Sequence, residues 1–165
     1  MKPRLLLHIC CAACATRELV RLARDYAVTG CFANPDIASE EEFLRRAIRL
    51  ERLAAEWHVP FEVVPRDHAR FLVWTSGLEG GQRNGQRCTA CYRLRLAVAA
   101  ERAVAYGCTH FATTLTDRPG PPSVAELGRE AGHANGLVFV GRETESAGPD
   151  GQCSCACEFS ISDCD

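Results

Sequence analysis

Short apolar runs alternate along the chain with longer segments in which apolar residues recur every three or four positions. The apolar runs predict strands at residues 4–9, 28–33, 61–64, 110–115 and 137–140. The periodic segments predict helices at about residues 16–25, 39–57, 68–74, 89–106 and 123–134. Strands that alternate with helices of this length are typical of βαβ units. The pattern therefore predicts an α/β fold, in which helices cover both faces of a parallel sheet.

The helix predicted after Ser39 has the clearest signals. Ser39 is a favourable N-cap, and the glutamates at 40–42 suit the positive end of the helix dipole. The apolar positions of this helix recur at spacings of four and three, as Phe43, Ala47, Leu50, Ala54 and Trp57. We expect this face to pack against the sheet.

The composition fits one globular domain and excludes several other classes of protein. A chain of 165 residues can bury a core, and 47% apolar with 24% charged residues excludes a disordered or fibrous chain. We therefore assign residues 1–165 to one domain that ends in a cysteine-rich tail at about residues 141–165, for which the cysteine motifs described below imply metal binding. The net charge of −2 predicts no long-range attraction to nucleic acid, although it is compatible with a local basic patch.

The N-terminus lacks the pattern of an export signal. Lys2 and Arg4 precede three leucines, but His8 interrupts an apolar run that is shorter than the roughly 7–15 residues of a secretory core. No stretch approaches the roughly 20 apolar residues of a membrane-spanning helix. We therefore expect a cytoplasmic protein without membrane association. In a reducing cytoplasm, clustered cysteines are typical of metal ligands.

Cysteine is the unusual residue, with 11 in the chain. Most of them fall in three groups, which are Cys10, Cys11 and Cys14, then Cys88 and Cys91, then Cys153, Cys155 and Cys157. Cys31 and Cys108 lie in or beside apolar segments, where a free cysteine is usually a small core residue. Cys164 stands alone near the end of the sequence. The grouping predicts a metal site.

The first two groups lie where the fold would place such a site. Cys10 and Cys11 follow the first predicted strand, and ligands of parallel sheets bind beyond the carboxyl ends of the strands. Cys88 and Cys91 begin an alanine-rich helix, whose free N–H groups stabilise thiolates. Adjacent cysteines are poor ligands of one tetrahedral zinc ion. Six or seven thiolates also exceed the four that one zinc ion or one ordinary iron–sulfur cluster uses. The pattern therefore indicates a polynuclear or two-part metal site.

Five motifs stand in order along the chain. They are LLHICCAAC at residues 6–14, NPDI at 34–37 with Glu42, Phe43 and Arg46, RCTAC at 87–91 with RLRL at 93–96, FATTL at 111–115, and CACEFS at 155–160. Together they resemble the QueH-type epoxyqueuosine reductases, which open with LLHxCCAPC and end with CGCxFS. The motifs cover most of the chain, and their combination is specific.

The resemblance implies a three-layer HUP-like fold, related to that of the PP-loop ATPases but without their phosphate loop. It also implies a [4Fe–4S] cluster with an adjacent mononuclear iron ion. By motif position, the implied ligands are Cys10, Cys11, Cys88, Cys91, Cys155 and Cys157, with Cys14 as a further metal ligand. Cys153 has no counterpart in the family.

Members of this family reduce the epoxide of epoxyqueuosine, a modified guanosine in tRNA anticodons, to the alkene of queuosine. Removing an epoxide oxygen needs two electrons, a Lewis acid and a proton source. His8, Asp36 and Glu42 are candidates for the proton donor or for groups that support the metal ligands, and a surface turn or helix cap is the simpler role for each. The resemblance thus implies tRNA as a partner and an external electron donor.

Two segments depart from the family's pattern. Residues 117–122, DRPGPP, stand where the family has SPxKN, and only Gln152 remains of the segment with RQNY before the last cysteines. Those parts would help to hold the nucleoside and the tRNA. Three hypotheses therefore remain: a reductase of epoxyqueuosine in tRNA, a related iron–sulfur reductase of a different and smaller substrate, and a non-enzymatic zinc or disulfide module.

One predicted helix carries a row of arginines, at Arg45, Arg46, Arg49 and Arg52. Such a row can contact tRNA phosphates. The simpler interpretation is a solvated helix face, paired with the acidic residues Glu41, Glu42 and Glu56.

Overall fold

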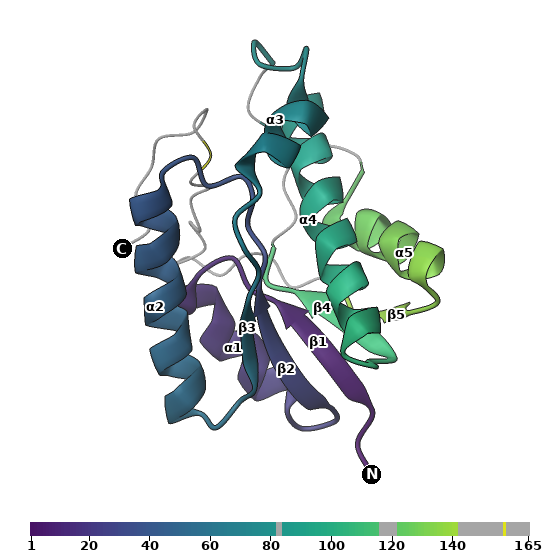
Figure 1. The fold of residues 1–165 in the computed structure, drawn as a ribbon. Helices are drawn as coiled ribbons and strands as arrows, with labels where there is room; N and C mark the ends of the chain where they lie inside the picture. The colour runs from purple at the N-terminus through teal and green to yellow at the C-terminus, as the bar shows by residue number, and fades with distance from the viewer. Residues whose placement is uncertain (82–83, 116–121, 142–156, 158–165) are drawn as a thin grey trace.

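Parallel strands form the centre of the protein in the computed structural model (Figure 1). The structure describes residues 1–81, 84–115 and 122–141, together with Cys157. In chain order the strands are β1 (Arg4–His8), β2 (Ala27–Phe32), β3 (Phe61–Val63), β4 (His110–Thr113) and β5 (Val138–Phe139). Their order across the sheet is β3-β2-β1-β4-β5, and every pairing is parallel. The predicted α/β fold with a parallel sheet is confirmed.

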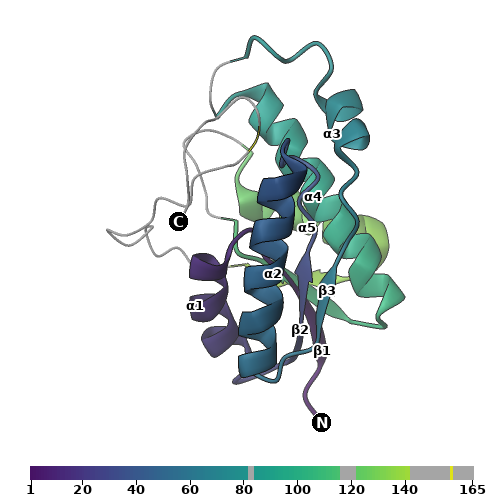
Figure 2. The same ribbon diagram turned by 60° about the vertical axis from the view of Figure 1, so that its left-hand side comes forward.

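Helices cover both faces of this sheet (Figures 1 and 2). They are α1 (Ala12–Leu22), α2 (Glu40–Glu56), α3 (His68–Thr75), α4 (Gln86–Ala105) and α5 (Val124–Asn135). α1 and α2 lie on one face, whereas α4 and α5 lie on the other, with α3 packed beside α4. The three-layer arrangement that was expected is therefore present.

The leucines of β1 divide the core between the two outer layers. Leu5 and Leu7 pack with α1 and α2, whereas Leu6 packs with α4 and with Phe111 of β4. All three leucines are fully buried. A central strand of a parallel sheet is covered on both faces, which explains why the sequence of β1 is a continuous apolar run.

Two helices begin earlier than predicted, and both differences concern cysteines. α1 begins at Ala12 rather than at residue 16, with Cys11 as its extended N-cap, so that Cys14 lies in its first turn. α4 begins at Gln86 rather than at residue 89, after Gly85 as its N-cap. The first turns of both helices consist of small and polar residues without apolar periodicity. For this reason the hydrophobic pattern placed both boundaries too late.

The N-cap and the apolar face predicted for α2 are confirmed, and Arg46 is buried as well. Ser39 caps the helix, because its Oγ accepts a hydrogen bond from the Glu42 N–H at 3.3 Å. The predicted core positions are buried up to residue 54, and Trp57 is half-buried. Arg46 was expected on a solvated face, but it is buried and pairs with Glu42.

The strand order reverses at the boundary between β1 and β4. From β1 the chain builds outward through β2 to β3, then crosses to the other side of β1 and forms β4 and β5. Ligands of open parallel sheets bind beyond the carboxyl ends of the strands at such a reversal. The segments that follow β1, β2 and β4 are therefore the expected location of a site.

Parts of the predicted organisation lie outside the described residues. These parts are most of the proline-rich break at 117–122 and nearly all of the tail at about 141–165, so the tail assignment stays a prediction. In the described ranges, no helix is long and apolar enough to cross a membrane. The cysteines that the structure describes are free thiols.

The close approach of α5 to β5 generates a prediction about stability. A Cβ added at Gly128 would lie 2.4 to 2.5 Å from ring carbons of Phe139. Alanine favours a helix over glycine by roughly 0.5–1 kcal/mol. We nevertheless expect Gly128→Ala to lower the free energy of unfolding by about 1–3 kcal/mol, because the ring must move. Chemical denaturation measures the change. Gly80→Ala is the control, since nothing lies within 4 Å of its added Cβ, and unchanged stability of Gly128→Ala would contradict the packing.

Candidate metal centre

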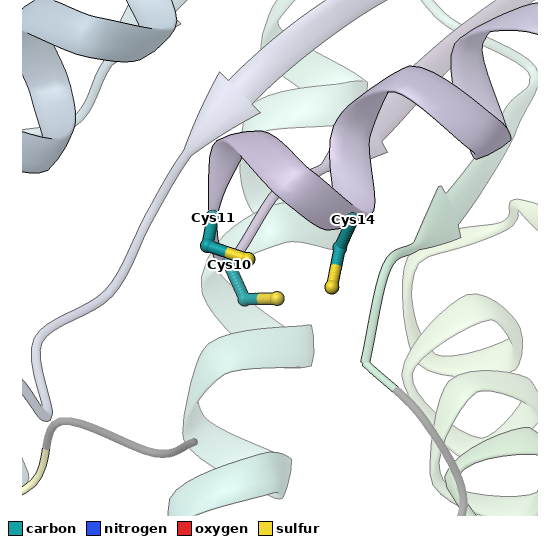
Figure 3. Close-up of side chains that lie close together, drawn as sticks. All are labelled: Cys10, Cys11 and Cys14. Atoms are coloured by element: carbon teal, nitrogen blue, oxygen red, sulfur yellow. The ribbon is translucent and has the colours of Figure 1, made fainter. Parts of the chain in front are cut away.

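Three thiols converge directly after β1 (Figure 3). The sulfur atoms of Cys10, Cys11 and Cys14 lie within 4.8 Å of one another. Cys10 and Cys11 are buried in the turn between β1 and α1, and Cys14 is half-buried in the first turn of α1. Figure 3 shows their sulfur atoms gathered on one side of that turn. The structure thus brings together the first of the three cysteine groups.

The end of β4 holds Cys10 in place. The Cys10 N–H donates to Thr114 Oγ1 at 2.9 Å, and the Thr114 hydroxyl donates to Cys10 Sγ at 3.1 Å. Thr114 is itself fixed, because its N–H donates to the His8 carbonyl at 2.9 Å. A hydrogen bond to sulfur favours the thiolate, which is the form that binds metals.

Cys91 and Cys157 approach the same region from other parts of the chain. Cys91, in the second turn of α4, is 4% exposed and belongs to the same buried cluster as Cys10 and Cys11. Cys157 belongs to this cluster too, and it forms an antiparallel bridge with Ile37 in the segment after β2. Cys91 and Cys157 are thus buried, whereas in the described part of the chain the close group of thiols consists of Cys10, Cys11 and Cys14.

Cys88 and Cys155 complete the predicted set of ligands. Cys88 is half-buried in the first turn of α4, and its sulfur accepts a hydrogen bond from the Asn84 N–H at 3.3 Å. Cys153, Cys155 and Cys164 lie outside the described residues. Assigning these cysteines as ligands therefore stays a prediction.

The donor set of the thiol group fits a metal ion or cluster that prefers soft ligands. Thiolates select zinc, copper(I) and iron–sulfur clusters. The first turn of α1 carries no acidic residue, so its N–H groups and dipole stabilise negative charge on the nearby sulfur atoms. Buried thiolates this close would repel one another, and a bound cation offsets that repulsion.

His8 lies at the end of β1, and both of its ring nitrogens are engaged. Nδ1 is 2.7 Å from Thr113 Oγ1, and Nε2 is 3.1 Å from the Ala33 carbonyl oxygen. Burial, helped by the charge of Arg95, lowers the pKa of His8 to about 3. The imidazole is therefore neutral at physiological pH and connects the ends of β1, β2 and β4. Of the two predicted roles, these contacts favour support of the ligands.

A buried arginine connects the two segments that carry the first two cysteine groups. Arg95 lies one turn after Cys91 on α4, where its guanidinium donates to Asn34 Oδ1 and lies 3.4 Å from Asp36 Oδ2. Asn34 donates in turn from Nδ2 to the Ile9 carbonyl at 2.9 Å, directly before Cys10. Asp36 therefore belongs to a buried network that ties α4 to the turn after β1.

Glu42 is part of an ion-pair cluster on α2. Its carboxylate accepts hydrogen bonds from Arg45 at 2.8 Å and from Arg46. Burial alone would raise the pKa of Glu42, but the hydrogen bonds from the two arginines hold it below its ordinary value. Among the described residues, no carboxylate joins the close group of thiols after β1. The role of Glu42 in proton transfer stays a prediction.

Cys31 and Cys108 are core residues, as predicted. They are 0% and 6% exposed. Burial raises the pKa of the Cys31 thiol to about 12, with the nearby charge of Glu62 adding to the effect. Burial also raises the pKa of the Cys108 thiol. Both side chains therefore remain protonated thiols in the fold.

Three supporting residues had no role assigned from the sequence, although each lies in a motif. They are Asn34, Arg95 and Thr114, and all are buried. The available signal was a polar residue at a position where the strand or helix pattern predicts burial. Arg95, for example, stands between the buried Leu94 and Leu96.

Comparisons with known proteins decide the family. The family model described as epoxyqueuosine reductase QueH matches residues 5–148 of the chain. The chain belongs to this family. It is 34% identical over 128 residues to epoxyqueuosine reductase QueH of Streptococcus pyogenes serotype M1, a match that covers 72% of this chain and 49% of that protein. The Staphylococcus aureus (strain Mu50) protein of the same name is 32% identical over 140 residues, covering 79% and 58%.

The coverage of the QueH relatives is partial. A third relative, from Staphylococcus epidermidis, is 29% identical over 150 residues, which is 84% of this chain and 63% of that protein. The chain thus spans about half to two thirds of the length of the curated relatives it matches. The residues matched by the family model include the first two cysteine groups.

The Arg95 network generates a prediction about stability. Arg95→Met keeps the length of the side chain but removes the cation that faces Asp36. We expect the free energy of unfolding to fall by about 3–5 kcal/mol, because a buried carboxylate loses its ion-pair partner. Arg93→Met is the matched control two residues earlier. It breaks an exposed ion pair with Glu130 and should lower the free energy of unfolding by less than about 1 kcal/mol.

Adding Asp36→Asn to Arg95→Met should restore part of the lost stability, because the buried carboxylate is then removed. Denaturant unfolding measures the stability of each variant. Equal effects of the two arginine variants would contradict the network.

The burial of the core cysteines generates a prediction about thiol reactivity. At pH 8, a thiol with a pKa of about 12 is a thiolate in only about one molecule in ten thousand. We expect iodoacetamide to leave Cys31 and Cys108 unmodified in the folded, metal-free protein, whereas the half-buried Cys14 and Cys88 react. Peptide mass spectrometry gives the extent of labelling at each position. Labelling of Cys31 at the rate of Cys88 would show that the packing is wrong.

Proposed function

We propose that this chain is an iron–sulfur reductase that deoxygenates the epoxide of epoxyqueuosine in tRNA to give queuosine. The proposed ligands of a [4Fe–4S] cluster and an adjacent mononuclear iron are Cys10, Cys11, Cys88, Cys91, Cys155 and Cys157, with Cys14 as a further metal ligand. The observation that carries the proposal is the convergence of Cys10, Cys11 and Cys14 in a chain of the QueH family. The overall reaction consumes two electrons from an external donor and two protons, and it releases the epoxide oxygen as water.

The arrangement of the thiols supports a site with more than one metal. Cys10 and Cys11 are adjacent in sequence, yet their sulfur atoms and that of Cys14 all lie within 4.8 Å of one another. Neighbouring ligands of this kind suit two metals better than one tetrahedral ion. Cys91 and Cys157 are two further buried cysteines in the described part of the chain. The number of thiols thus supports a cluster together with a separate iron.

The residues around the thiols would determine how such a group behaves. Thr114 Oγ1 donates to the sulfur of Cys10, and the Asn84 N–H donates to the sulfur of Cys88. Hydrogen bonds to ligand sulfur atoms tune reduction potentials. Cys10 and Cys11 are 7% and 6% exposed, which keeps bulk water away from them. When bound, the metal group would supply single electrons and a Lewis acid for the epoxide oxygen.

The source of the protons is proposed among the three polar residues that the motifs indicated. Asp36 is buried beside Arg95, close to the turn of Cys10 through Asn34. His8 is held neutral between Thr113 and Ala33, which suits a residue that orients its neighbours. Glu42 is held as an anion by Arg45 and Arg46. Glu42 therefore has to take up a proton before it can donate one.

A second candidate function is a related reductase that acts on a smaller substrate without tRNA. The observation that favours it is the sequence at residues 117–122, DRPGPP, where the family's SPxKN is replaced. This reductase would have the same iron and sulfide content, but its activity would not depend on tRNA. A zinc or disulfide module, by contrast, would contain no acid-labile sulfide.

Anaerobic reconstitution with iron and sulfide tests these functions together. The proposal expects acid-labile sulfide, more than four iron ions per chain, an EPR signal after reduction, and queuosine in digested tRNA that carried epoxyqueuosine. Cys10→Ser should lose at least half of the iron and nearly all of the product, because one sulfur ligand and its Thr114 contact are lost. Cys31→Ser removes a core thiol and is the control that should keep its iron.

The outcomes of this experiment separate the candidates. Zinc without sulfide would establish the non-enzymatic module. Iron and sulfide with no queuosine formed, under a strong reductant, would favour the smaller substrate.

A further inference from the structure

A groove lined by arginines lies between α1 and α2. Its volume is about 730 Å³. The α2 side presents Arg45, Arg49 and Arg52, and the α1 side consists of the small residues Ala12, Ala13 and Thr16. Figures 1 and 2 both show the two helices side by side on the outer layer of the sheet. The groove is therefore an accessible channel with one basic wall and one small, uncharged wall.

The positive charge of this wall is largely available for a ligand. Arg46, on the same helix, is buried and is paired with Glu42, and Arg45 also contacts Glu42 at 2.8 Å. Within the described part of the chain, neither Arg49 nor Arg52 forms an ion pair. Glu56 is the one acidic residue among the described residues that line the groove. The pairing with Glu42 expected from the sequence is thus present at Arg45 and Arg46, whereas in the described part of the chain Arg49 and Arg52 have no ion-pair partner.

The spacing of the arginines suits a ligand with regularly repeated negative charges. Positions 45, 49 and 52 are about one turn apart, so they follow one another along α2 at rises of about 6 Å and about 4.5 Å. Arginine binds phosphate oxygens through two parallel N–H groups. The exposed Ile48 lies among them and offers an apolar surface to a sugar or a base. These features match an extended phosphodiester strand better than a single small anion.

The groove and the thiols share the first turn of α1 but lie on different faces of it. Ala12, Ala13 and Thr16 face the groove. Because successive residues of a helix are rotated by about 100°, Cys11 and Cys14 lie on the far side of the same turn. A strand bound in the groove would thus pass within about one helix diameter of the candidate metal centre.

We propose that the groove between α1 and α2 binds the phosphodiester backbone of RNA through Arg49 and Arg52, with Arg45 as a third contact. The choice of tRNA as this RNA rests on the proposed function. The net charge of the chain is only −2, so attraction to RNA depends on this local patch rather than on the field of the whole protein.

Salt-dependent binding of an unmodified tRNA transcript to the full chain tests the proposal. Each phosphate contact contributes about 0.7–0.9 to the slope of log affinity against log salt. Arg49→Gln/Arg52→Gln should therefore reduce the slope by about 1.4–1.8 and weaken binding about tenfold at low salt. The control Arg24→Gln/Arg129→Gln removes the same charge from exposed residues outside the groove, and it should keep the wild-type slope.

A variant that is expected to strengthen binding keeps the test independent of damage to the fold. Glu56→Gln removes the acidic lining residue, and we expect it to tighten tRNA binding. Circular dichroism shows whether each variant keeps its helical content. Equal slopes for the groove variant, its control and the wild type would overturn the proposal, as would a failure of the wild type to bind the transcript.

Two further measurements separate the groove from the proposed function and from another class of partner. If the wild type binds the transcript through the groove but forms no queuosine, then the proposed function fails and the groove proposal stands. If queuosine forms at wild-type rates in the groove variant, then the groove proposal fails alone. Binding of polyglutamate with the same dependence on Arg49 and Arg52 would indicate an acidic protein partner, and it would overturn the assignment to RNA.

Discussion

The parallel pairing of β1 with both β2 and β4 is the constraint on which the rest of the structure depends. In this register His8 pairs with Cys31 of β2 and with Thr113 of β4, so the three strands end at one edge of the sheet. The turn of Cys10 therefore lies next to Thr114 and next to the segment that carries Asn34. Neither residue is near Cys10 in sequence. Their contacts with this turn arise because β1 pairs with both β2 and β4.

The buried polar groups at this edge fix the position of the cysteine turn through directional contacts, but removing these groups from water is unfavourable. His8, Arg95, Asp36 and Asn34 are all 4% exposed or less, and desolvation of such groups is unfavourable unless each has partners. The partners come from β4, α4 and the segment after β2, so these polar contacts form when the elements dock together. A cysteine turn that was held by apolar packing alone would lack this directional control. The network thus connects folding to the geometry of the site.

Much of the fold could be predicted from the sequence, because burial leaves a periodic signal. The strands and helices appear in the predicted order, and Ser39 and Cys31 have the predicted positions. The hydrophobic pattern did not predict the first turns of α1 and α4. Their residues are small, polar or cysteine, and they show no apolar periodicity. The spatial partners of Cys10 could not be predicted. Thr114 and Arg95 reach this region through strand pairing and helix docking, which no local pattern encodes.

In the two proposals, the faces of α1 serve two kinds of chemistry. The face with Cys14 needs a thiolate environment, which the free N–H groups at the helix start provide. The same partial positive charge favours anions on the opposite face, where Ala12 and Ala13 leave room beside the arginines of α2. Larger residues at positions 12 and 13 would fill the groove without touching the thiols. Small residues there therefore keep the groove open for the proposed approach of a polyanion.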